Sequence, residues 1–446
     1  MVAAALTNAL VAATRFGYAP KPGELTTIAQ DPRGWALHQL EAKPTLLDPS
    51  LPASPGMVAE FLRARQEFRQ NKDPDSRKTE NQRLRAVYLA ELDARMHAAV
   101  DGDAPLQERL VRFWSNHFTV SCVRPIIRGF AGAFEREAIR PHITGRFVDM
   151  LLAAERHPAM LFYLDQVLSI GPNSPAGRRQ RRGLNENLAR EMMELHTLGV
   201  DGGYTQDDVE ALARILTGWS IARLNDPNVG QFHFYPQLHE PGAQRLLGKT
   251  YAESGYDQGE LALRDLAAYP ATATHIATKL ARHFIADDPP KESVQRIAAV
   301  FRETGGDLKR VTQAVIREDA AWKAFAKVRA PEDLLIACCR VTGFTPPAQF
   351  QAQTLRALDQ QPFFAPQPEG WSDQAKDWIG PEAVLHRADC CESLAARLPN
   401  PPDPVTLADD VFGEALPDDA GQAIRRSASR REGLALLLAS PEFQRR

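Results

Sequence analysis

The sequence predicts an all-α fold, a single large multi-helix domain over residues 1–446 with one β-hairpin or extended excursion around 229–250. Apolar residues recur at helical spacing between proline- and glycine-containing turns along most of the chain. Alternating aromatics between turns are confined to the excursion. With 446 residues, 44% hydrophobic and 24% charged, the chain has the size and composition of a globular protein with a sizeable core.

The first 60 residues predict short helices broken by prolines. The start of the chain superficially resembles a signal peptide, yet no Lys or Arg precedes Arg15 and Asn8 interrupts the apolar run. We therefore expect an amphipathic first helix that ends near Phe16, which favours the cytoplasm and leaves a periplasmic or exported protein open. No run approaches the roughly 18 apolar residues that span a bilayer.

The next segments predict helices over 57–68, 84–97 and 105–118, with the very polar run 69–83 between the first two as a mobile, exposed loop. In the third helix an apolar stripe ends at His117, which places its imidazole on the side that faces the core. A single core histidine is more often structural than functional. Asn116 lies beside it on the same helix.

A further helix is predicted to follow Pro158, and Asp165 shares its apolar face. A carboxylate on such a face requires a partner, and Arg190 is the candidate that we expect. The segment 171–182 is predicted to be a flexible basic loop. Its arginines are either solvated or hold an anion.

The central stretch, residues 184–219, predicts a helix, a glycine loop and a second helix. At about 100° per residue, Asn187, Arg190, Glu191 and Glu194 of the first helix fall within one arc. The arc is either a solvated face with an Arg190–Glu194 pair or a buried polar surface that holds a metal or does acid/base chemistry.

The second helix of this stretch has a clear start. Thr205 and Asp208 have the spacing of a capping box, and an apolar helical face follows. Residues 221–256 then form the excursion, in which His233 and His239 lie six positions apart. If the excursion folds onto the central helix, the two histidines become metal ligands; otherwise they are structural.

The C-terminal half predicts amphipathic helices, joined by a proline- and aromatic-rich stretch over 361–378 that caps a core or binds a flat or sugar-like ligand. We expect these helices at 259–284, 291–316, 330–341, 381–394 and 432–439. The excursion divides the domain into two sub-lobes, residues 1–220 and 257–446.

Several motifs resemble a bacterial family known as domain of unknown function 1800. They are RFGYAPKPGEL, RFWSNHF, YLD, ENLAREMMELHTLGVDGGYTQDDVEALARILTGW, FHFYPQLHEPGAQRLLGK, KLARHFIADDPP, GWS at 370–372 and LLLASPEFQRR. The resemblance covers nearly the whole chain in the same order. It implies a largely α-helical protein and no particular reaction. It also implies a co-encoded sulfatase-like protein as a partner, and export for many members. This chain differs from those members in showing no clear leader, which leaves its compartment open.

The first functional hypothesis is an enzyme of hydrolytic type that acts on a polar, carbohydrate-like substrate. Its catalytic residues would be Glu191, Glu194, His117 and Asp165, with the paired carboxylates as general acid and base. Arg190, Asn187, Asn116 and Trp219 would bind the substrate. A divalent metal, if present, would take its ligands from the following set: His117, Glu191, Glu194, His233 and His239.

The second hypothesis is a non-catalytic structural or partner protein whose polar cluster is a buried packing network. A metal-dependent redox protein is a weaker alternative, because the Glu-x-x-Glu spacing differs from the Glu-x-x-His of di-iron helices. Nucleic acid is not expected as a partner, since the net charge is −3 and the basic loops lack interleaved aromatics. The five cysteines include two adjacent pairs and no metal-site spacing, so neither a disulfide framework nor a zinc site is predicted.

Overall fold

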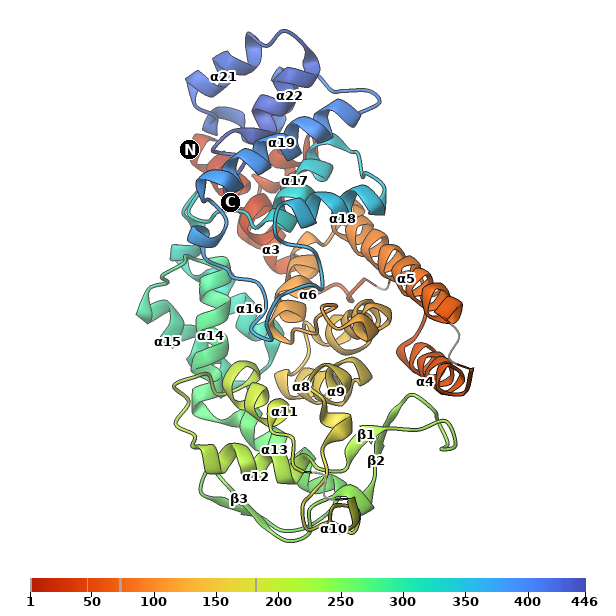
Figure 1. Ribbon diagram of the computed structural model, residues 1–446. Coiled ribbons are helices and arrows are strands. Elements are labelled where there is room, and N and C mark those ends of the chain that lie inside the picture. Colours follow the sequence, from red (N-terminus) through yellow and green to blue (C-terminus); the bar gives the residue numbers. More distant parts are fainter. Residues whose placement is uncertain (1, 46, 72–73, 181–182) are drawn as a thin grey trace.

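A computed structural model of the chain describes residues 2–45, 47–71, 74–180 and 183–446 (Figure 1). The predicted fold class is confirmed: helices α1 to α22 make up most of the described residues, and the strands there form two small two-stranded sheets. None of the helices in this described part is long and apolar enough to cross a membrane.

The N-terminal helices precede the long α5, which projects from the body of the molecule beside α4 (Figure 1). Their bounds are α1 (Val2–Val11), the π-helical η1 (Ala12–Phe16), α2 (Glu24–Ile28), α3 (Pro32–His38), α4 (Ser54–Asn71) and α5 (Pro74–Asp101).

The middle of the chain forms the following elements: α6 (Pro105–His117), η2 (Pro125–Gly129), α7 (Ala131–Phe134), η3 (Glu135–Ile139), η4 (Arg140–His142), α8 (Phe147–Arg156), α9 (Pro158–Tyr163), η5 (Gln166–Leu168), α10 (Gly177–Gln180), α11 (Asn187–Glu191), η6 (Met192–His196) and α12 (Gln206–Leu216). The capping box at the start of α12 is confirmed, because Thr205 and Asp208 exchange their side-chain and backbone hydrogen bonds.

The excursion is confirmed, but it begins earlier than predicted and contains two hairpins. Strand β1 (Trp219–Ile221) pairs antiparallel with β2 (Phe232–Phe234), and after η7 (Pro236–Leu238) strand β3 (Gln244–Leu246) pairs with β4 (Lys249–Tyr251).

The remaining helices run to the end of the chain: α13 (Tyr256–Ala268), α14 (Pro270–Phe284), α15 (Lys291–Glu303), α16 (Leu308–Arg317), η8 (Asp319–Trp322), α17 (Pro331–Thr342), α18 (Ala348–Ala357), η9 (Ala375–Asp377), α19 (Pro381–Arg397), α20 (Pro404–Phe412), η10 (Gly413–Ala415), α21 (Asp418–Arg425) and α22 (Arg430–Ala439).

Both segments predicted as loops contain helix. In 69–83, α4 continues to Asn71 and α5 already begins at Pro74, while residues 72–73 lie outside the described part. Arg, Lys, Glu and Gln are good helix formers, and Pro74 fits the first helical turn, so the described part of this polar run lies in the end of one helix and the start of the next. In 171–182, α10 covers Gly177–Gln180, and residues 181–182 lie outside the description.

The central helix is shorter than predicted and changes its winding. It begins at Asn187, and after Glu191 it continues as the π-helical η6. The wider turn ends in Thr197, whose hydroxyl donates to the Met192 carbonyl at 2.6 Å. The carbonyls of Leu195 and His196 then accept hydrogen bonds from other helices, as described below. π-turns of this kind are frequent at functional sites.

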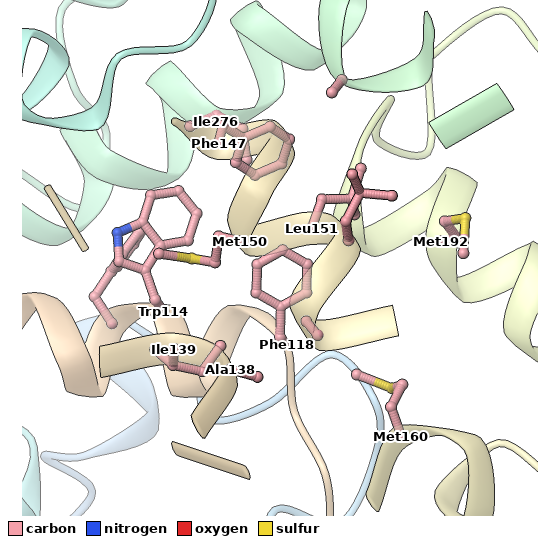
Figure 2. Packing of buried hydrophobic residues seen from close by; sticks show 14 of the residues in the cluster. Trp114, Phe118, Ala138, Ile139, Phe147, Met150, Leu151, Met160, Met192 and Ile276 are labelled. Atoms are coloured by element: carbon pink, nitrogen blue, oxygen red, sulfur yellow. The ribbon is translucent and has the colours of Figure 1, made fainter. Parts of the chain in front are cut away.

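The main core takes most of its buried side chains from helices between α6 and α16, with a few from the N-terminal helices. Trp114 and Phe118 from the α6 region pack against Phe147 of α8, and Met192 of η6 lies in the same cluster (Figure 2). Each of these side chains is buried.

A second core joins the two ends of the chain, which lie at the same end of the molecule in Figure 1. It contains side chains of α1 and α2 together with those of α17, α19, α20 and α22. Near it, Val328 forms a β-bridge with Arg445. The five cysteines are free thiols and all are buried.

Candidate active site

A cavity of about 90 Å³ lies where α5, α6, α14, α17, the segment 360–378 and Arg446 meet. It is small, and charged and aromatic groups face it from all sides. Its ionisable lining residues are Arg95, Arg112, His283, Glu332, Asp333, Asp373 and Arg446, and its aromatic ones are Phe113, Phe363, Trp371 and Trp378.

The amide of Asn116, at the end of α6, fixes one wall of this pocket. Its Nδ2 donates to the Trp371 carbonyl at 2.8 Å, and its Oδ1 accepts from the Trp371 N–H at 2.7 Å. The backbone approaches so closely that a Cβ on Gly370, at φ 86°, would lie 2.5 Å from the Asn116 carbonyl oxygen. Only glycine fits at this turn, which explains the Gly-Trp-Ser sequence there.

A carboxylate and an imidazole form a pair in the same pocket. The Nδ1–H of His283, on α14, donates to Asp373 Oδ1 at 2.7 Å. The other ring nitrogen, Nε2, is buried and has no hydrogen-bond partner among the described residues. Because the carboxylate holds the proton on Nδ1, Nε2 carries the free lone pair.

Burial determines the protonation of this pair. It lowers the pKa of His283 below its ordinary value, and Asp373 opposes the shift only in part. For Asp373, burial alone would raise the pKa of the carboxyl, but His283 and Lys327 outweigh burial and hold it well below its usual range. At neutral pH the pair is therefore a neutral imidazole beside a carboxylate, the state of a general base.

Arg446 contributes a cation next to this base. Its Nη2 donates to the His283 carbonyl at 3.1 Å, and its Nε lies 3.4 Å from Asp333 Oδ2 without hydrogen-bond geometry. Its Nη1 is buried and unpartnered within the described part of the chain. Burial and the nearby Arg109 lower the pKa of Arg446 to about 10, so the guanidinium stays charged at neutral pH.

A buried ion-pair network supports another part of the pocket lining. Arg95 Nε donates to Glu135 at 2.8 Å, and Arg112 Nε donates to Glu332 at 3.2 Å. Arg95 also pairs with Glu332, which ties α5, α6 and α17 together. Charges that are paired in this way fix the positions of the groups around the cavity.

His117 is buried and contacts the inner side of the central helical segment. Its Nε2–H donates to the carbonyl of His196 at 3.1 Å, and its Nδ1 is buried without a partner in the described structure. The ring centroids of His196 and His275 each lie 6.1 Å from that of His117. Burial lowers the pKa of His117 well below its ordinary value, and the nearby Lys279 adds to the shift.

The histidine cluster should make stability depend on pH. Burial lowers the pKa of His275 from 6.5 to about 4, so below pH 6.5 the unfolded chain binds more protons than the folded one. The stability that this group contributes is present above pH 6.5 and is lost as the pH falls towards 4. We expect His275→Gln to reduce the loss of unfolding free energy between pH 7 and pH 5 by about 1–2 kcal/mol.

Urea unfolding of both proteins at pH 5, 7 and 8 measures this difference. The other histidines titrate alike in the two proteins, so their contributions cancel. Between pH 7 and pH 8 the two proteins should change in parallel. An identical loss between pH 7 and pH 5 would contradict the assignment.

The predicted polar arc lies on the half-exposed face of the central helix. Asn187 is exposed, whereas Glu191 and Glu194 are half-buried. Arg190 pairs with Glu186 at 2.9 Å rather than with Glu194, because a glutamate one turn before the cation has the better orientation and the helix becomes π-helical after Glu191. Burial and the neighbouring Glu194 raise the pKa of Glu191, while His196 opposes the shift. In the described structure neither Glu191 nor Glu194 lines the pocket of His283.

Asp165 has an ion-pair partner, as expected, but the partner is Arg124 and the predicted pair with Arg190 is wrong. Both oxygens of Asp165 accept from Arg124, at 2.6 and 2.7 Å. The helix α9 ends at Tyr163, and Asp165 itself adopts a left-handed conformation at φ 58°. The carboxylate therefore leaves the apolar stripe that a continuous helix would have given it.

The remaining predicted residues lie in or beside the first hairpin. Trp219 is buried in β1 and stacks on Tyr256, while His233 in β2 lies with its ring centroid 4.4 Å from that of Tyr235. The buried His239 donates from Nδ1 to the Thr217 carbonyl at 2.8 Å. Over residues 2–45, 47–71, 74–180 and 183–446, no group of three or more His, Cys, Asp or Glu side chains is arranged to hold a metal ion.

Of the predicted site residues, Asn116 is the one that lines the pocket. Helical spacing does not reveal His283, Asp373 and Arg446, because each lies on a different segment. The family motifs could have pointed to these three residues. His283 lies in KLARHFIADDPP, Asp373 follows GWS, and Arg446 is the last residue of LLLASPEFQRR. These separate motifs, together with RFWSNHF, converge on one cavity.

Comparison with known proteins gives one assignment. No curated protein and no solved structure matches the chain. A family model described as "Protein of unknown function (DUF1800)" matches residues 11–445. Since this match covers nearly the whole chain, the protein belongs to the DUF1800 family.

Proposed function

We propose that the protein is a hydrolase that cleaves a small polar ester in the pocket of His283, Asp373 and Arg446. One observation carries the proposal: the buried, neutral imidazole of His283 lines the pocket and has an unpartnered Nε2, while a carboxylate holds its other nitrogen. Buried polar atoms normally have a partner, and an orphaned one in a cavity indicates a missing ligand or a catalytic role.

The proposed reaction uses these groups as follows. His283 Nε2 takes a proton from a water molecule, whose oxygen adds to the ester carbonyl carbon. The negative charge on the carbonyl oxygen is stabilised by the free Nη1–H of Arg446. When the intermediate collapses, the C–O bond to the alcohol breaks, and the alkoxide takes the proton back from His283. Asp373 orients the ring and stabilises the imidazolium.

The two tryptophans in the pocket lining favour a substrate whose alcohol part is polyhydroxylated and carbohydrate-like. Trp371 and Trp378 both line the pocket, and their ring centroids are 6.2 Å apart. Indole faces pack well against the apolar face of a sugar, and their polar edges tolerate water. The cavity volume of about 90 Å³ admits the acyl end of such a substrate rather than a whole sugar.

A second candidate is a non-catalytic protein in which the buried charges only hold the packing. The network of Arg95, Arg112, Glu135 and Glu332 favours it, since every one of these groups already has a charged partner. The two candidates differ at His283 and Arg446, whose free atoms a purely structural role would not use.

The test is hydrolysis of a panel that contains p-nitrophenyl acetate, acetylated monosaccharides and p-nitrophenyl glycosides. We expect turnover of the acetyl esters, and we expect Arg446→Gln to lower kcat about 10²-fold, the usual effect of losing one oxyanion donor. Arg445→Gln is the matched control, because the neighbouring arginine is exposed and its Nη1 donates only to the Phe325 carbonyl.

Two outcomes would contradict the proposal. One is a wild-type protein that hydrolyses no ester faster than Arg446→Gln does. The other is hydrolysis of glycosides that depends on Glu191 instead of His283, which would favour the paired carboxylates of the central helix.

A further inference from the structure

A second hollow, of about 530 Å³, lies on the other side of the segment 360–365, between α5, η2 and α18. Three arginines line it: Arg85 from α5, Arg128 from η2 and Arg356 from α18. No acidic side chain is among its described lining residues. We call it the arginine groove.

None of these three guanidinium groups has an acidic partner among the residues that the structure describes. The contrast with Arg83 is direct, because that arginine lies two residues before Arg85 and pairs with Glu60 and Glu80. Arg128 stacks on the ring of Phe364 at 5.5 Å, and its Nε is buried without a hydrogen-bond partner. A buried, unpaired donor on a cation is costly unless a ligand satisfies it.

The rest of the groove supplies neutral hydrogen-bonding groups. Gln349 and Gln353 line it from the α18 side, and Gln361 lines it from the segment between the two cavities. Gln361 donates to the Tyr88 hydroxyl at 3.3 Å, which in turn donates to the Pro362 carbonyl at 3.3 Å. Guanidinium forks beside amides form a donor-rich surface that suits tetrahedral oxyanions.

The wall between the two cavities is fixed in place. Side chains of residues 360–365 divide between them, so that Phe363 faces the active-site pocket and Phe364 faces the arginine groove. The Phe363 carbonyl accepts from the Cys122 N–H at 2.7 Å, and the Ala365 carbonyl accepts from the Ser121 hydroxyl at 2.6 Å. The aromatic platform under Arg128 is therefore preorganised.

We propose that the arginine groove binds the tetrahedral oxyanion of a phosphate or sulfate ester. Arg128, whose guanidinium lies over the ring of Phe364, binds the anion, Arg85 and Arg356 close over it from the exposed sides, and the volume leaves room for the organic part of the ester. This site is separate from the hydrolytic pocket and does not depend on its proposed chemistry.

The test is isothermal titration calorimetry of the full chain with phenyl phosphate and phenyl sulfate at constant ionic strength. Benzyl alcohol serves as the neutral probe. We expect one site that binds the anions and not the alcohol, and we expect Arg128→Gln and Arg356→Gln each to weaken binding by about tenfold. Arg426→Gln, at an exposed position after α21, is the matched control and should bind like the wild type.

Comparing phenyl phosphate with phenyl sulfate at two pH values distinguishes a phosphate site from a sulfate site. A phosphate site should bind phenyl phosphate more strongly at pH 7.5 than at pH 5.5, because the second proton leaves near pH 6, while a sulfate monoanion is unaffected. The proposal is overturned if neither anion binds, if benzyl alcohol binds equally well, or if Arg128→Gln and Arg426→Gln bind alike. A fold check by circular dichroism excludes unfolding as the cause of lost binding.

Discussion

Replacing Asp373 with asparagine is expected to lower the turnover of the proposed ester substrate by about 10³–10⁴-fold. The carboxylate accepts the Nδ1–H of His283, whereas an asparagine amide can donate to that nitrogen and move the ring proton to Nε2. The lone pair that takes the proton from water would then be lost. Steady-state kinetics on the ester identified by the panel measures the effect.

The comparison variants make this prediction specific. His283→Gln should cost as much as Asp373→Asn, and the double variant should cost no more than either, because the two residues act as one unit. Asp377→Asn, whose carboxylate accepts from Ser372 at 2.5 Å in the same segment, should retain activity. Additive losses would show that the residues do not act together.

The pH profile gives an independent readout of the same pair. Because burial lowers the pKa of His283, the acid limb of kcat/KM should lie below pH 6.5. A limb above pH 7 would assign the base to another group.

The largest expected effect on stability is at Glu155. Its side chain and that of His196 are both 0% exposed, and they meet at 2.7 Å beneath the central helix. Glu155→Ala leaves the Nδ1–H of His196 buried without an acceptor, and we expect it to lower the free energy of unfolding by about 3–5 kcal/mol. Urea unfolding at pH 7 measures the change.

Two further variants separate burial from charge. Glu155→Gln keeps an acceptor for the imidazole, so it should cost about 1–2 kcal/mol. Glu194→Ala removes a carboxylate from the half-exposed face of the same helical segment and should cost less than about 1 kcal/mol. Equal losses at Glu155 and Glu194 would contradict the distinction between the two faces.

Helical periodicity predicts the fold class well here, and it fails where different structures share the same residue pattern. The polar run 69–83 illustrates this, because a solvated loop and a solvated helix contain the same Arg, Lys, Glu and Gln residues. The π-turn at Met192–His196 is equally invisible, since it leaves the composition of the helix unchanged. The capping box of α12 was predictable because its two side chains lie three residues apart and bond locally.

The candidate site was predictable only in part, because its groups come from distant segments. Spacing placed His117 on the core side of α6, and the residue is buried there. Spacing could not show that Asp165, just after α9, adopts a left-handed backbone conformation and pairs with Arg124. Spacing also could not predict the contact between Asp373 and His283, because the two residues meet only after the segment 360–378 has packed against α14.

The distribution of the pocket residues along the chain has a consequence for folding kinetics. Arg95, His283, Asp373 and Arg446 come from the first quarter to the last residues of the sequence, and they meet only through long-range contacts. Contacts of high sequence separation form slowly, since the loop between them must first close. During refolding, the fluorescence of the main core around Trp114 should therefore recover before any activity of the pocket returns.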